Sequence, residues 1–454
     1  MLLQSINPYT GETLEQIEQI DGTALEAVLD AAARAASTWG ARPVAERATL
    51  LHEVATLLRA RAPELARRMT LEMGKLVGEA EAEIGKCALV CDYYAEHAER
   101  LLADEPIASD ASRSLVVYQP LGPLLAVMPW NFPFWQVFRC AAPALAAGHP
   151  VLLKHASNVP RCALEIERLF ADAGAPDGVF STLLIDAHRA AAVVADPRVR
   201  AVSLTGSDAA GRRVASIAGE HLKRTVLELG GSDAFVVLED ADLDEAVATA
   251  VRSRFMNAGQ SCIAAKRFIV VDAIAEAFVA RLRTAIEALA PGDPLDPKTT
   301  LAPLARADLR DTLHEQVLAS LDAGARLVVG GRPLDRPGWF YAATLLDAVG
   351  PGMPAYDDEL FGPVAAVLRA ADEGEALEIA NDSRFGLGGS VWTRDSARGE
   401  RFARRMACGC AFVNGLVKSE PRLPFGGIKD SGYGRELGSL GIHEFVNAKT
   451  LWIR

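Results

Sequence analysis

One cysteine, Cys262, lies among small and polar residues in the stretch FMNAGQSCIAAK, residues 255–266. A cysteine that only packs usually has apolar neighbours, whereas a reactive cysteine needs a lowered pKa and access to substrate. Gly259 and the neighbouring small residues leave room for a substrate and place backbone N–H groups beside the sulfur. Such groups can stabilise the oxyanion that forms when a thiolate attacks a carbonyl. The stretch is compatible with a nucleophile, and a buried packing cysteine is the alternative.

Two other polar residues could complete a site of this kind. Asn131 lies in PWNFPFWQ, residues 129–136, where prolines and aromatic residues hold it at a strand end. A buried amide must find partners, and its NH₂ group is a good oxyanion donor. Glu228 ends an apolar strand 22 residues after Gly206. It could be a general base or the ribose-binding acid of a Rossmann unit. No histidine has a clear Cys-His-Asn context, which argues against a papain-like hydrolase.

Short apolar segments alternate with helical patterns from about residue 115 onward. This alternation predicts an α/β fold in which helices cover both faces of a parallel sheet. A second strand-helix series from 235 to about 415 predicts a second α/β domain. Helices are expected before residue 115, one ending at Gly40 and one following Pro43. The expected strands are LLAVM (124–128), VLLK (151–154), AVSLT (201–205), TVLEL (225–229) and FVVL (235–238), with helices at about 160–173, 187–196 and 208–219.

Polar residues and glycines follow two of these strands. Lys154 and Ser157 come after one strand, and Gly206 and Ser207 come between another strand and a helix. Glycine lets a backbone approach a ligand, and a helix N-terminus favours phosphate. The spacing is GxxxxG, neither GxGxxG nor a P-loop. A nucleotide site and an ordinary βα turn are both compatible with it.

The composition narrows the classes of partner. The 454 residues carry a net charge of −12, and no basic run suggests nucleic acid. We expect no membrane span and no signal peptide, because neither pattern is present. An odd number of cysteines, seven, favours a reducing cytoplasm over a disulfide framework. Two close pairs, Cys87 with Cys91 and Cys408 with Cys410, are expected to pack rather than to bind zinc or act as a redox pair. The sequence therefore predicts no metal site.

Taken together, the motifs resemble the aldehyde dehydrogenase superfamily in order, in spacing and over essentially the whole chain. The segments that carry the resemblance are INPYTGE (6–12), PWNFP (129–133), LTGS (204–207), LELGGS (227–232), NAGQSC (257–262), ELFGPV (359–364) and PFGGIKDSGYGRELG (424–438).

The resemblance implies two doubly wound α/β domains and a small β-flap. The cofactor-binding, Rossmann-like domain would comprise residues 1–101 and 121–228, and the catalytic domain residues 229–432. Segments 102–120 and 433–454 would form the flap, through which the chain would assemble as a homodimer or homotetramer. Two isolated strands, SLVVYQ (114–119) and the C-terminal tail, fit this assignment because an unpaired strand edge seeks a partner.

The resemblance also assigns roles to residues. Cys262 would be the nucleophile, Asn131 with the Cys262 N–H the oxyanion hole, and Glu228 the general base, in place of the ribose-binding role. NAD or NADP would be the cofactor, and both should be accepted because Ser157 stands where many NAD-preferring relatives have a glutamate. The expected cofactor-binding residues are Trp130, Lys154, Ser157, Gly206, Ser207, Glu359 and Phe361.

The substrate is expected to be a small aldehyde. WQV-x-R (135–139) and LLKHA (152–156) are similar to the shorter bacterial NAD(P)-dependent succinate semialdehyde dehydrogenases. Arg139 would then bind the substrate carboxylate through two parallel hydrogen bonds from its guanidinium. The remaining expected substrate-binding residues are Phe132, Trp135, Met256, Ser261 and Ser419.

Two residues depart from the pattern of those enzymes. Met256 stands where many have a second substrate arginine, and Ala264 replaces a cysteine that some use as a redox switch, so that switch should be absent. A broad medium-chain or aromatic aldehyde dehydrogenase is therefore the main alternative. A cysteine esterase or acyl-transfer protein is disfavoured by the cofactor residues, and a non-catalytic relative by the retained Cys262, Asn131 and Glu228.

Overall fold

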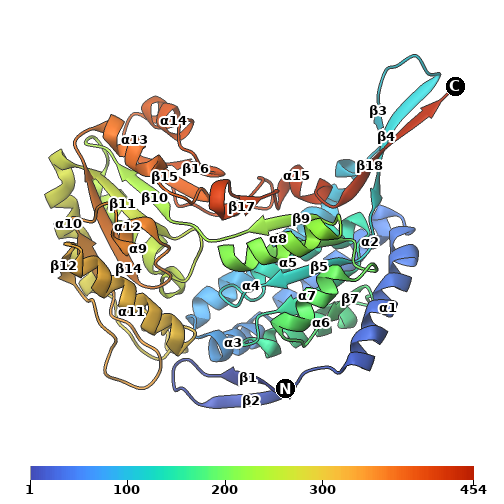
Figure 1. Cartoon of the computed structure of the whole chain (residues 1–454), viewed down its shortest axis with the longest axis horizontal. Coiled ribbons are helices and arrows are strands. Elements are labelled where there is room, and N and C mark those ends of the chain that lie inside the picture. Colours follow the sequence, from blue (N-terminus) through green and yellow to red (C-terminus); the bar gives the residue numbers. More distant parts are fainter. Residues whose placement is uncertain (1) are drawn as a thin grey trace.

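The structure is a computed structural model that describes residues 2–454, with two large sheets and two small ones (Figure 1). The strands are β1 (Leu2–Ile6), β2 (Thr13–Glu18), β3 (Glu105–Pro106), β4 (Arg113–Pro120), β5 (Leu124–Met128), β6 (Val151–His155), β7 (Phe180–Thr182), β8 (Ala201–Thr205), β9 (Arg224–Glu228), β10 (Asp233–Val237), β11 (Ala265–Val271), β12 (Arg326–Val329), β13 (Thr344–Asp347), β14 (Val364–Ala370), β15 (Gly388–Trp392), β16 (Cys410–Val413), β17 (Gly432–Tyr433) and β18 (Val446–Ile453).

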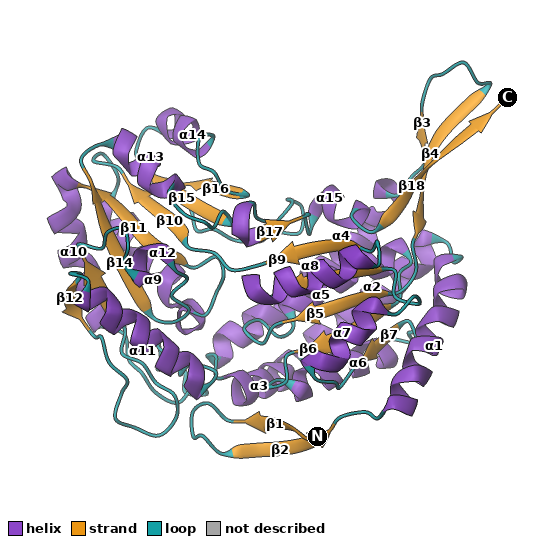
Figure 2. Cartoon of the chain, in the orientation of Figure 1, coloured by secondary structure: helices purple, strands orange, loops and turns teal. Residues whose placement is uncertain are grey.

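Helices lie on both large sheets (Figure 2). They are α1 (Gly22–Gly40), α2 (Val44–Ala60), α3 (Ala62–Met73), α4 (Val77–Leu101), α5 (Trp135–Ala147), α6 (Pro160–Asp172), α7 (Ala187–Ala195), α8 (Asp208–Glu220), α9 (Leu243–Phe255), α10 (Asp272–Glu287), α11 (Ala307–Asp322), α12 (Pro354–Asp357), α13 (Glu373–Asn381), α14 (Ser396–Ala403) and α15 (Gly438–His443), with short 3-10 turns η1 (Met256–Gly259) and η2 (Lys429–Ser431). Among the described residues, no helix combines the length and the apolar character that crossing a membrane would require.

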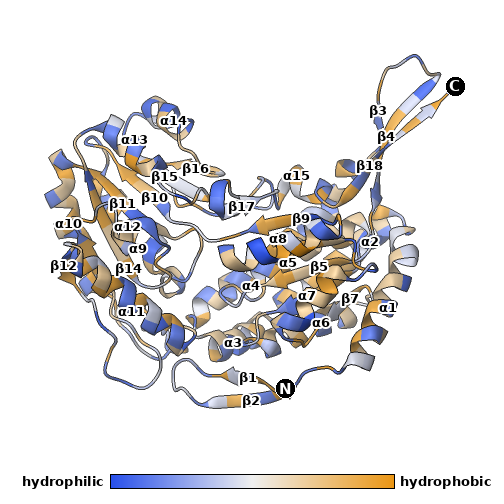
Figure 3. Cartoon of the chain, in the orientation of Figure 1, coloured by the Kyte–Doolittle hydropathy of each residue, from blue (hydrophilic) through white to orange (hydrophobic). Residues whose placement is uncertain are grey.

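The first large sheet has six strands in the order β17-β9-β8-β5-β6-β7, parallel except for β17. The predicted strands 124–128 and 201–205 are confirmed residue for residue. Strand β5 is apolar throughout, and β8 is apolar except for Ser203 and Thr205, which are buried. Figure 3 shows the hydrophobic character of the strands in this unit. Because β5, β6, β8 and β9 run in parallel, the residues that follow them meet at one edge of the sheet. That edge carries five of the seven predicted cofactor residues, Trp130, Lys154, Ser157, Gly206 and Ser207, whereas Glu359 and Phe361 come shortly before β14 of the second large sheet.

The second large sheet has seven strands in the order β12-β13-β14-β11-β10-β15-β16, parallel except for β12. Its central strand β11 is completely buried, and Cys262 lies three residues before it. The predicted second α/β unit is therefore confirmed as a fold. The domain boundaries remain a prediction. At one of them, the two-residue strand β17 leaves the second unit and pairs with β9 of the first.

Three segments form the predicted flap. Strands β18 and β4 pair antiparallel from Val446↔Pro120 to Ile453↔Arg113, and β3 adds to β4. This three-stranded sheet projects from the body in Figure 1, with the C-terminus at its end. The N-terminal hairpin of β1 and β2 was not predicted, because its alternating polar residues give no continuous apolar run.

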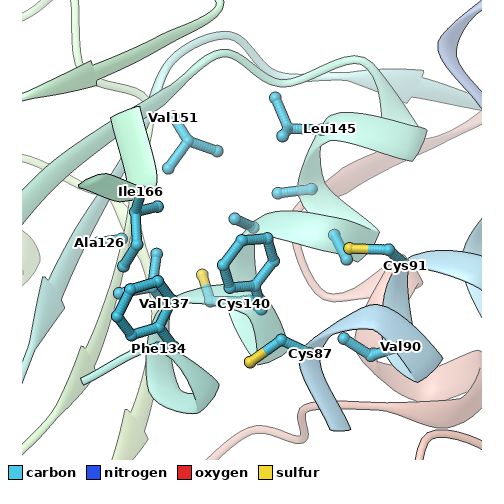
Figure 4. Packing of buried hydrophobic residues seen from close by; sticks show 14 of the residues in the cluster. Cys87, Val90, Cys91, Ala126, Phe134, Val137, Cys140, Leu145, Val151 and Ile166 are labelled. Atoms are coloured by element: carbon cyan, nitrogen blue, oxygen red, sulfur yellow. The ribbon is translucent and has the colours of Figure 1, made fainter. Parts of the chain in front are cut away.

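The cysteine pairs pack, as predicted. Cys87 and Cys91 of α4 are fully buried beside Val137 and Cys140 of α5 (Figure 4). Burial raises the pKa of both α4 thiols, so neither ionises to the reactive thiolate at neutral pH. Cys408 and Cys410 are free half-buried thiols. No group of three or more His, Cys, Asp or Glu side chains within residues 2–454 is placed to hold a metal ion.

Candidate active site

The backbone before Cys262 has an unusual conformation. Asn257, Ala258 and Gly259 follow one another with φ of 55°, 52° and 75°, in the left-handed region. Glycine and asparagine enter this region readily, whereas Ala258 does so at a steric cost. Arg254, fully buried, donates through Nη2 to the carbonyls of Gly259 (2.9 Å) and Leu360 (3.2 Å). The arginine therefore fixes the turn that presents Cys262, and it does not line the cavity.

Cys262 is half-buried and lies on the wall of a cavity of about 640 Å³. Burial, and after it the charge of Glu359, raises the pKa of the Cys262 thiol to about 12, while Lys266 and Arg139 oppose the shift. The thiol is therefore protonated at neutral pH in this structure. It needs a proton acceptor or a change in its surroundings before it can attack.

Glu228 is the last residue of β9 and lines the same cavity as Cys262. Neither of its carboxyl oxygens has a hydrogen-bond partner among the described residues. Burial raises the pKa of Glu228 well above its usual value, with Arg139 opposing and Glu436 reinforcing the shift. A buried carboxyl without partners can accept a proton from water once it has ionised, which is the property of a general base. The structure thus brings the expected nucleophile and base into one space.

Asn131 lies against the backbone of the Cys262 loop and does not line the cavity. The side-chain Nδ2 of Asn131 donates to the main-chain carbonyl of Gln260 at 3.1 Å. The main-chain carbonyl of Asn131 accepts a hydrogen bond from Asn257 Nδ2 at 2.8 Å. The amide has a second hydrogen, and the backbone N–H of Cys262 has no acceptor within residues 2–454. Each of these two donors therefore has a hydrogen without an acceptor among the described residues.

The remaining expected substrate residues line the cavity: Phe132, Trp135, Arg139, Met256, Ser261 and Ser419. Met256 is half-buried at the end of α9, directly before the strained turn. Ser419 is buried and receives hydrogen bonds from Trp135 Nε1 at 3.0 Å and from Lys86 Nζ at 2.8 Å. Lys86 was not predicted, because nothing in its own helical segment distinguishes it from a surface lysine.

Arg139 is in the cavity wall, but its guanidinium is already paired. It forms a buried ion pair with Glu436, donates to Thr205 Oγ1 at 3.2 Å, and stacks 4.8 Å from the ring of Phe425. Arg139 is 3% exposed, so the pair is buried. Bidentate binding of a substrate carboxylate by Arg139 remains a prediction. Glu436, the ion-pair partner of Arg139, was not predicted, although it lies within the C-terminal motif.

The cofactor residues predicted from the sequence lie along the strand ends. Lys154 is half-buried in β6, with a pKa lowered by burial, and the exposed Ser157 follows in the turn. Ser207 caps α8 by accepting from the N–H of Ala210 at 3.3 Å, directly after Gly206. Phe361 contacts Trp130 edge to face, with ring centroids 5.8 Å apart. These side chains form a path from the first sheet towards the Cys262 loop.

Glu359 connects that path with the nucleophile. It accepts from the N–H of Gly231 at 3.1 Å and lies 3.2 Å from Lys266 Nζ. Lys266 in turn donates to the carbonyl of Cys262 at 2.9 Å. A Cβ on Gly230 would lie 2.4 Å from Glu359 Oε2, so this glycine is needed for the carboxylate to approach. Lys266 was missed, although it lies four residues after the cysteine in the same stretch.

His155, directly after Lys154, has a structural role. Its Nδ1 accepts from the N–H of Ala156 at 2.8 Å, so its Nε2 carries the hydrogen and donates to the carbonyl of Pro133 at 2.8 Å. Burial lowers the pKa of His155 to about 4, so the ring is neutral at pH 7. The histidine ties the end of β6 to the segment that contains Asn131.

Comparison with known proteins gives consistent matches over the full length. The profile described as "Aldehyde dehydrogenase family" matches residues 2–451. The chain is 52% identical over 453 residues to a protein of Synechocystis sp. named probable succinate-semialdehyde dehydrogenase (NADP(+)), covering 100% of both. It is 50% identical over 456 residues to succinate-semialdehyde dehydrogenase (NADP(+)) 1 of Mycobacterium tuberculosis, again covering 100% of both. A crystal structure of succinic semialdehyde dehydrogenase from Streptococcus pyogenes with NADP⁺ superposes with a TM-score of 0.98, at 42% identity and 99% coverage of each chain.

Proposed function

Because the chain belongs to the aldehyde dehydrogenase family, we propose that it oxidises succinate semialdehyde to succinate, with NADP or NAD as the hydride acceptor. The observation that carries this proposal is that Cys262 and Glu228 line one cavity whose wall also holds the cationic side chains of Lys86 and Arg139. An aldehyde with a carboxylate at its far end fits such a cavity, because the thiol of Cys262 can react with the aldehyde group and a cationic side chain can bind the carboxylate.

The residues present fit a dinucleotide. Gly206 has open space where a Cβ would stand, with only Leu204 within 4 Å, so a ligand can approach the backbone there. Lys154 and Ser157 offer donors to a ribose or to its 2′-phosphate, and no carboxylate stands at Ser157 to repel that phosphate. Glu359 and Phe361 would hold the nicotinamide end. NADP or NAD bound there would supply the hydride acceptor for the oxidation at Cys262.

The chain's own residues perform the other steps. Cys262 gives its proton to the ionised Glu228 carboxylate, which passes it on to solvent. The sulfur then bonds to the aldehyde carbon, whose oxygen becomes an oxyanion held by Asn131 Nδ2 and the Cys262 N–H. Once the hydride has left, a thioester remains on Cys262. Glu228 takes a proton from water, the water oxygen attacks the thioester carbon, and the C–S bond breaks to release succinate. Because Glu228 is present for this step, we expect a free acid as the product.

Steady-state rates on a panel of aldehydes with each cofactor test the proposal. We expect kcat/KM for succinate semialdehyde to exceed that for butanal, its neutral four-carbon counterpart, by about tenfold or more, the value of one charge-assisted hydrogen bond. Both cofactors should support turnover. A higher kcat/KM for medium-chain or aromatic aldehydes would contradict the proposal and would favour the broad-specificity alternative, for which Met256 in the cavity wall provides an apolar surface.

A further inference from the structure

Lys266 is the extra residue of a β-bulge that lies beside the nucleophile. Asp233 of β10 pairs with Ala265 of β11, and the next pair along the two strands skips Lys266. A bulge re-aims a side chain out of the regular alternation of a strand. The side chain of Lys266 is 2% exposed, and it contacts residues that come just before its own strand. The bulge therefore directs a buried ammonium group at the peptide bonds around Cys262.

All three hydrogens of the Lys266 ammonium group have acceptors. Its Nζ donates to the main-chain carbonyls of Ser261 at 2.8 Å and Cys262 at 2.9 Å. The third acceptor is Glu359 Oε1, which lies 3.2 Å from the same nitrogen. The charge is thus paired with a carboxylate, while two hydrogen bonds hold the two peptide units that flank the α-carbon of Cys262.

The Ser261 carbonyl belongs to the same peptide unit as the N–H of Cys262. In a trans peptide these two groups point in opposite directions. Lys266 does not line the cavity, whereas Ser261 and Cys262 do, so the carbonyl is held on the interior side and the N–H is directed to the opposite side. The N–H of Ala264 donates to the same carbonyl at 3.2 Å. Two hydrogen bonds to one carbonyl, one of them from a cation, polarise the peptide unit and strengthen its N–H as a donor.

The charge of Lys266 also acts on the Cys262 thiol. Burial, and after it the charge of Glu359, raises the pKa of this thiol, and Lys266 is the strongest of the groups that oppose the shift. Removing the ammonium group would therefore lower the thiolate fraction as well as release the peptide. The thiolate fraction affects every reaction of the sulfur, whereas the N–H affects only a reaction that forms an oxyanion. This difference separates the two effects experimentally.

We propose that Lys266 is a positioning residue for the oxyanion hole: by holding the Ser261 carbonyl, it aims and polarises the Cys262 N–H that binds the oxyanion of the substrate. The inference rests on the proposed function, in which that N–H and Asn131 Nδ2 hold the oxyanion. Lys266 does not line the cavity, so it acts through the peptide and not on the substrate. Its ion pair with Glu359 fixes the same ammonium group to the segment that is expected to hold the nicotinamide.

The test compares two reactions of Cys262 at one pH and one NADP concentration. Alkylation by iodoacetamide needs the thiolate but forms no oxyanion, whereas aldehyde oxidation needs both. The ratio of kcat/KM to the alkylation rate of the Cys262 peptide therefore isolates the oxyanion contribution. We expect Lys266→Met to lower this ratio by about tenfold or more. The loss should be the same for succinate semialdehyde and for butanal, because their aldehyde groups are alike. Lys266→Arg, which keeps the charge and several donors, should lose less.

Lys429→Met is the matched control. Lys429 also donates to two main-chain carbonyls, those of Asn381 and Ser383 at 2.9 Å each, but it is exposed and does not line the cavity. This variant should leave the ratio unchanged. Urea unfolding checks that each variant is folded. Where Lys266→Met is not, Lys266→Gln takes its place with the same expected loss, because its amide is uncharged and shorter by one bond.

The outcomes distinguish this inference from the proposed function. If the unaltered protein oxidises no aldehyde with either cofactor, the proposed function fails. If it does, and the folded Lys266 variant loses alkylation rate and kcat/KM by the same factor, Lys266 acts on the thiol alone and its role in positioning the N–H is overturned. An unchanged kcat/KM in that variant would overturn the role as well.

Discussion

At the scale of single residues, Cys262 and Glu228 share one property. Burial raises the pKa of each above its ordinary value, for Cys262 to about 12, so the Cys262 thiol is protonated at neutral pH. A resting thiol is protected from oxidation, because thiolates are the reactive form. The positive groups nearest to Cys262, Lys266 and Arg139, favour its thiolate but do not outweigh its burial and the charge of Glu359. Activation is therefore expected to accompany ligand binding.

This account predicts how the free enzyme reacts with iodoacetamide. Because the pKa of Cys262 is raised to about 12, the thiolate fraction grows about tenfold per pH unit throughout the range from about pH 7 to about pH 9. The rate of carbamidomethylation at the Cys262 peptide, followed by mass spectrometry, should rise with that slope. A rate that levels off below about pH 8 would show that the resting thiol has an ordinary or lowered pKa.

At the scale of elements, the turn of residues 257–259 decides where the nucleophile stands. Its three left-handed residues are held by Arg254, whose pKa burial lowers to about 9, and by the Asn131–Asn257 hydrogen bond. A β-carbon on Gly259 would lie 2.3 Å from the carbonyl oxygen of Gly362 and 2.5 Å from Arg254 Nη2. The turn therefore couples the catalytic loop to the ELFGPV segment that carries the cofactor residues.

Gly259→Ala is accordingly expected to destabilise the protein by about 2 kcal/mol or more, because it combines a clash with a left-handed backbone. The loss should be visible as a lower midpoint in urea unfolding. Gly219→Ala is the matched control, since Gly219 lies in α8 with no atom within 4 Å of the added Cβ. That variant should unfold at the same urea concentration or slightly higher. Equal midpoints for both variants would refute the role given to the turn.

The sequence predicted these elements unevenly, for physical reasons. Strands 124–128 and 201–205 were found because strands buried on both faces read as short, mainly apolar runs, unbroken in LLAVM and interrupted by Ser203 in AVSLT. The run of left-handed residues was not predicted, because residue type says little about local backbone strain. The Arg139–Glu436 ion pair was not predicted either, because its two residues lie 297 positions apart in the sequence. Lys86 was missed for the same reason, since its partner Ser419 lies 333 positions away. Cys262, Asn131 and Glu228 were found through motifs rather than through spacing.

At the scale of the whole molecule, the flap exposes an open strand edge and apolar side chains that nothing within the single chain covers. Its outer strand β18 has an unpaired edge, and Ile107, Trp452 and Ile453 expose between 46% and 52% of their surface. A projecting sheet with open edges and exposed apolar side chains is a typical self-association surface. We therefore expect the chain to assemble as a homodimer or homotetramer through this sheet.

A triple variant with serine at Ile107, Trp452 and Ile453 should shift the mass measured by light scattering towards the 48.4 kDa of one chain. Leu222→Ser is the control, because Leu222 is 94% exposed on the body of the molecule, outside the flap. It should leave the measured mass unchanged. An unaltered mass in the triple variant would place the subunit contact elsewhere.

The central claim, that Cys262 carries the acyl intermediate and Glu228 hydrolyses it, is tested most directly by a single-turnover experiment on Glu228→Gln with succinate semialdehyde and NADP. The account predicts one equivalent of NADPH per active site in a rapid burst, followed by turnover slowed by about 100-fold or more, and a succinyl thioester on the Cys262 peptide in the quenched sample. A variant that turns over at the rate of the unaltered protein, or an acyl group on any residue other than Cys262, would contradict it.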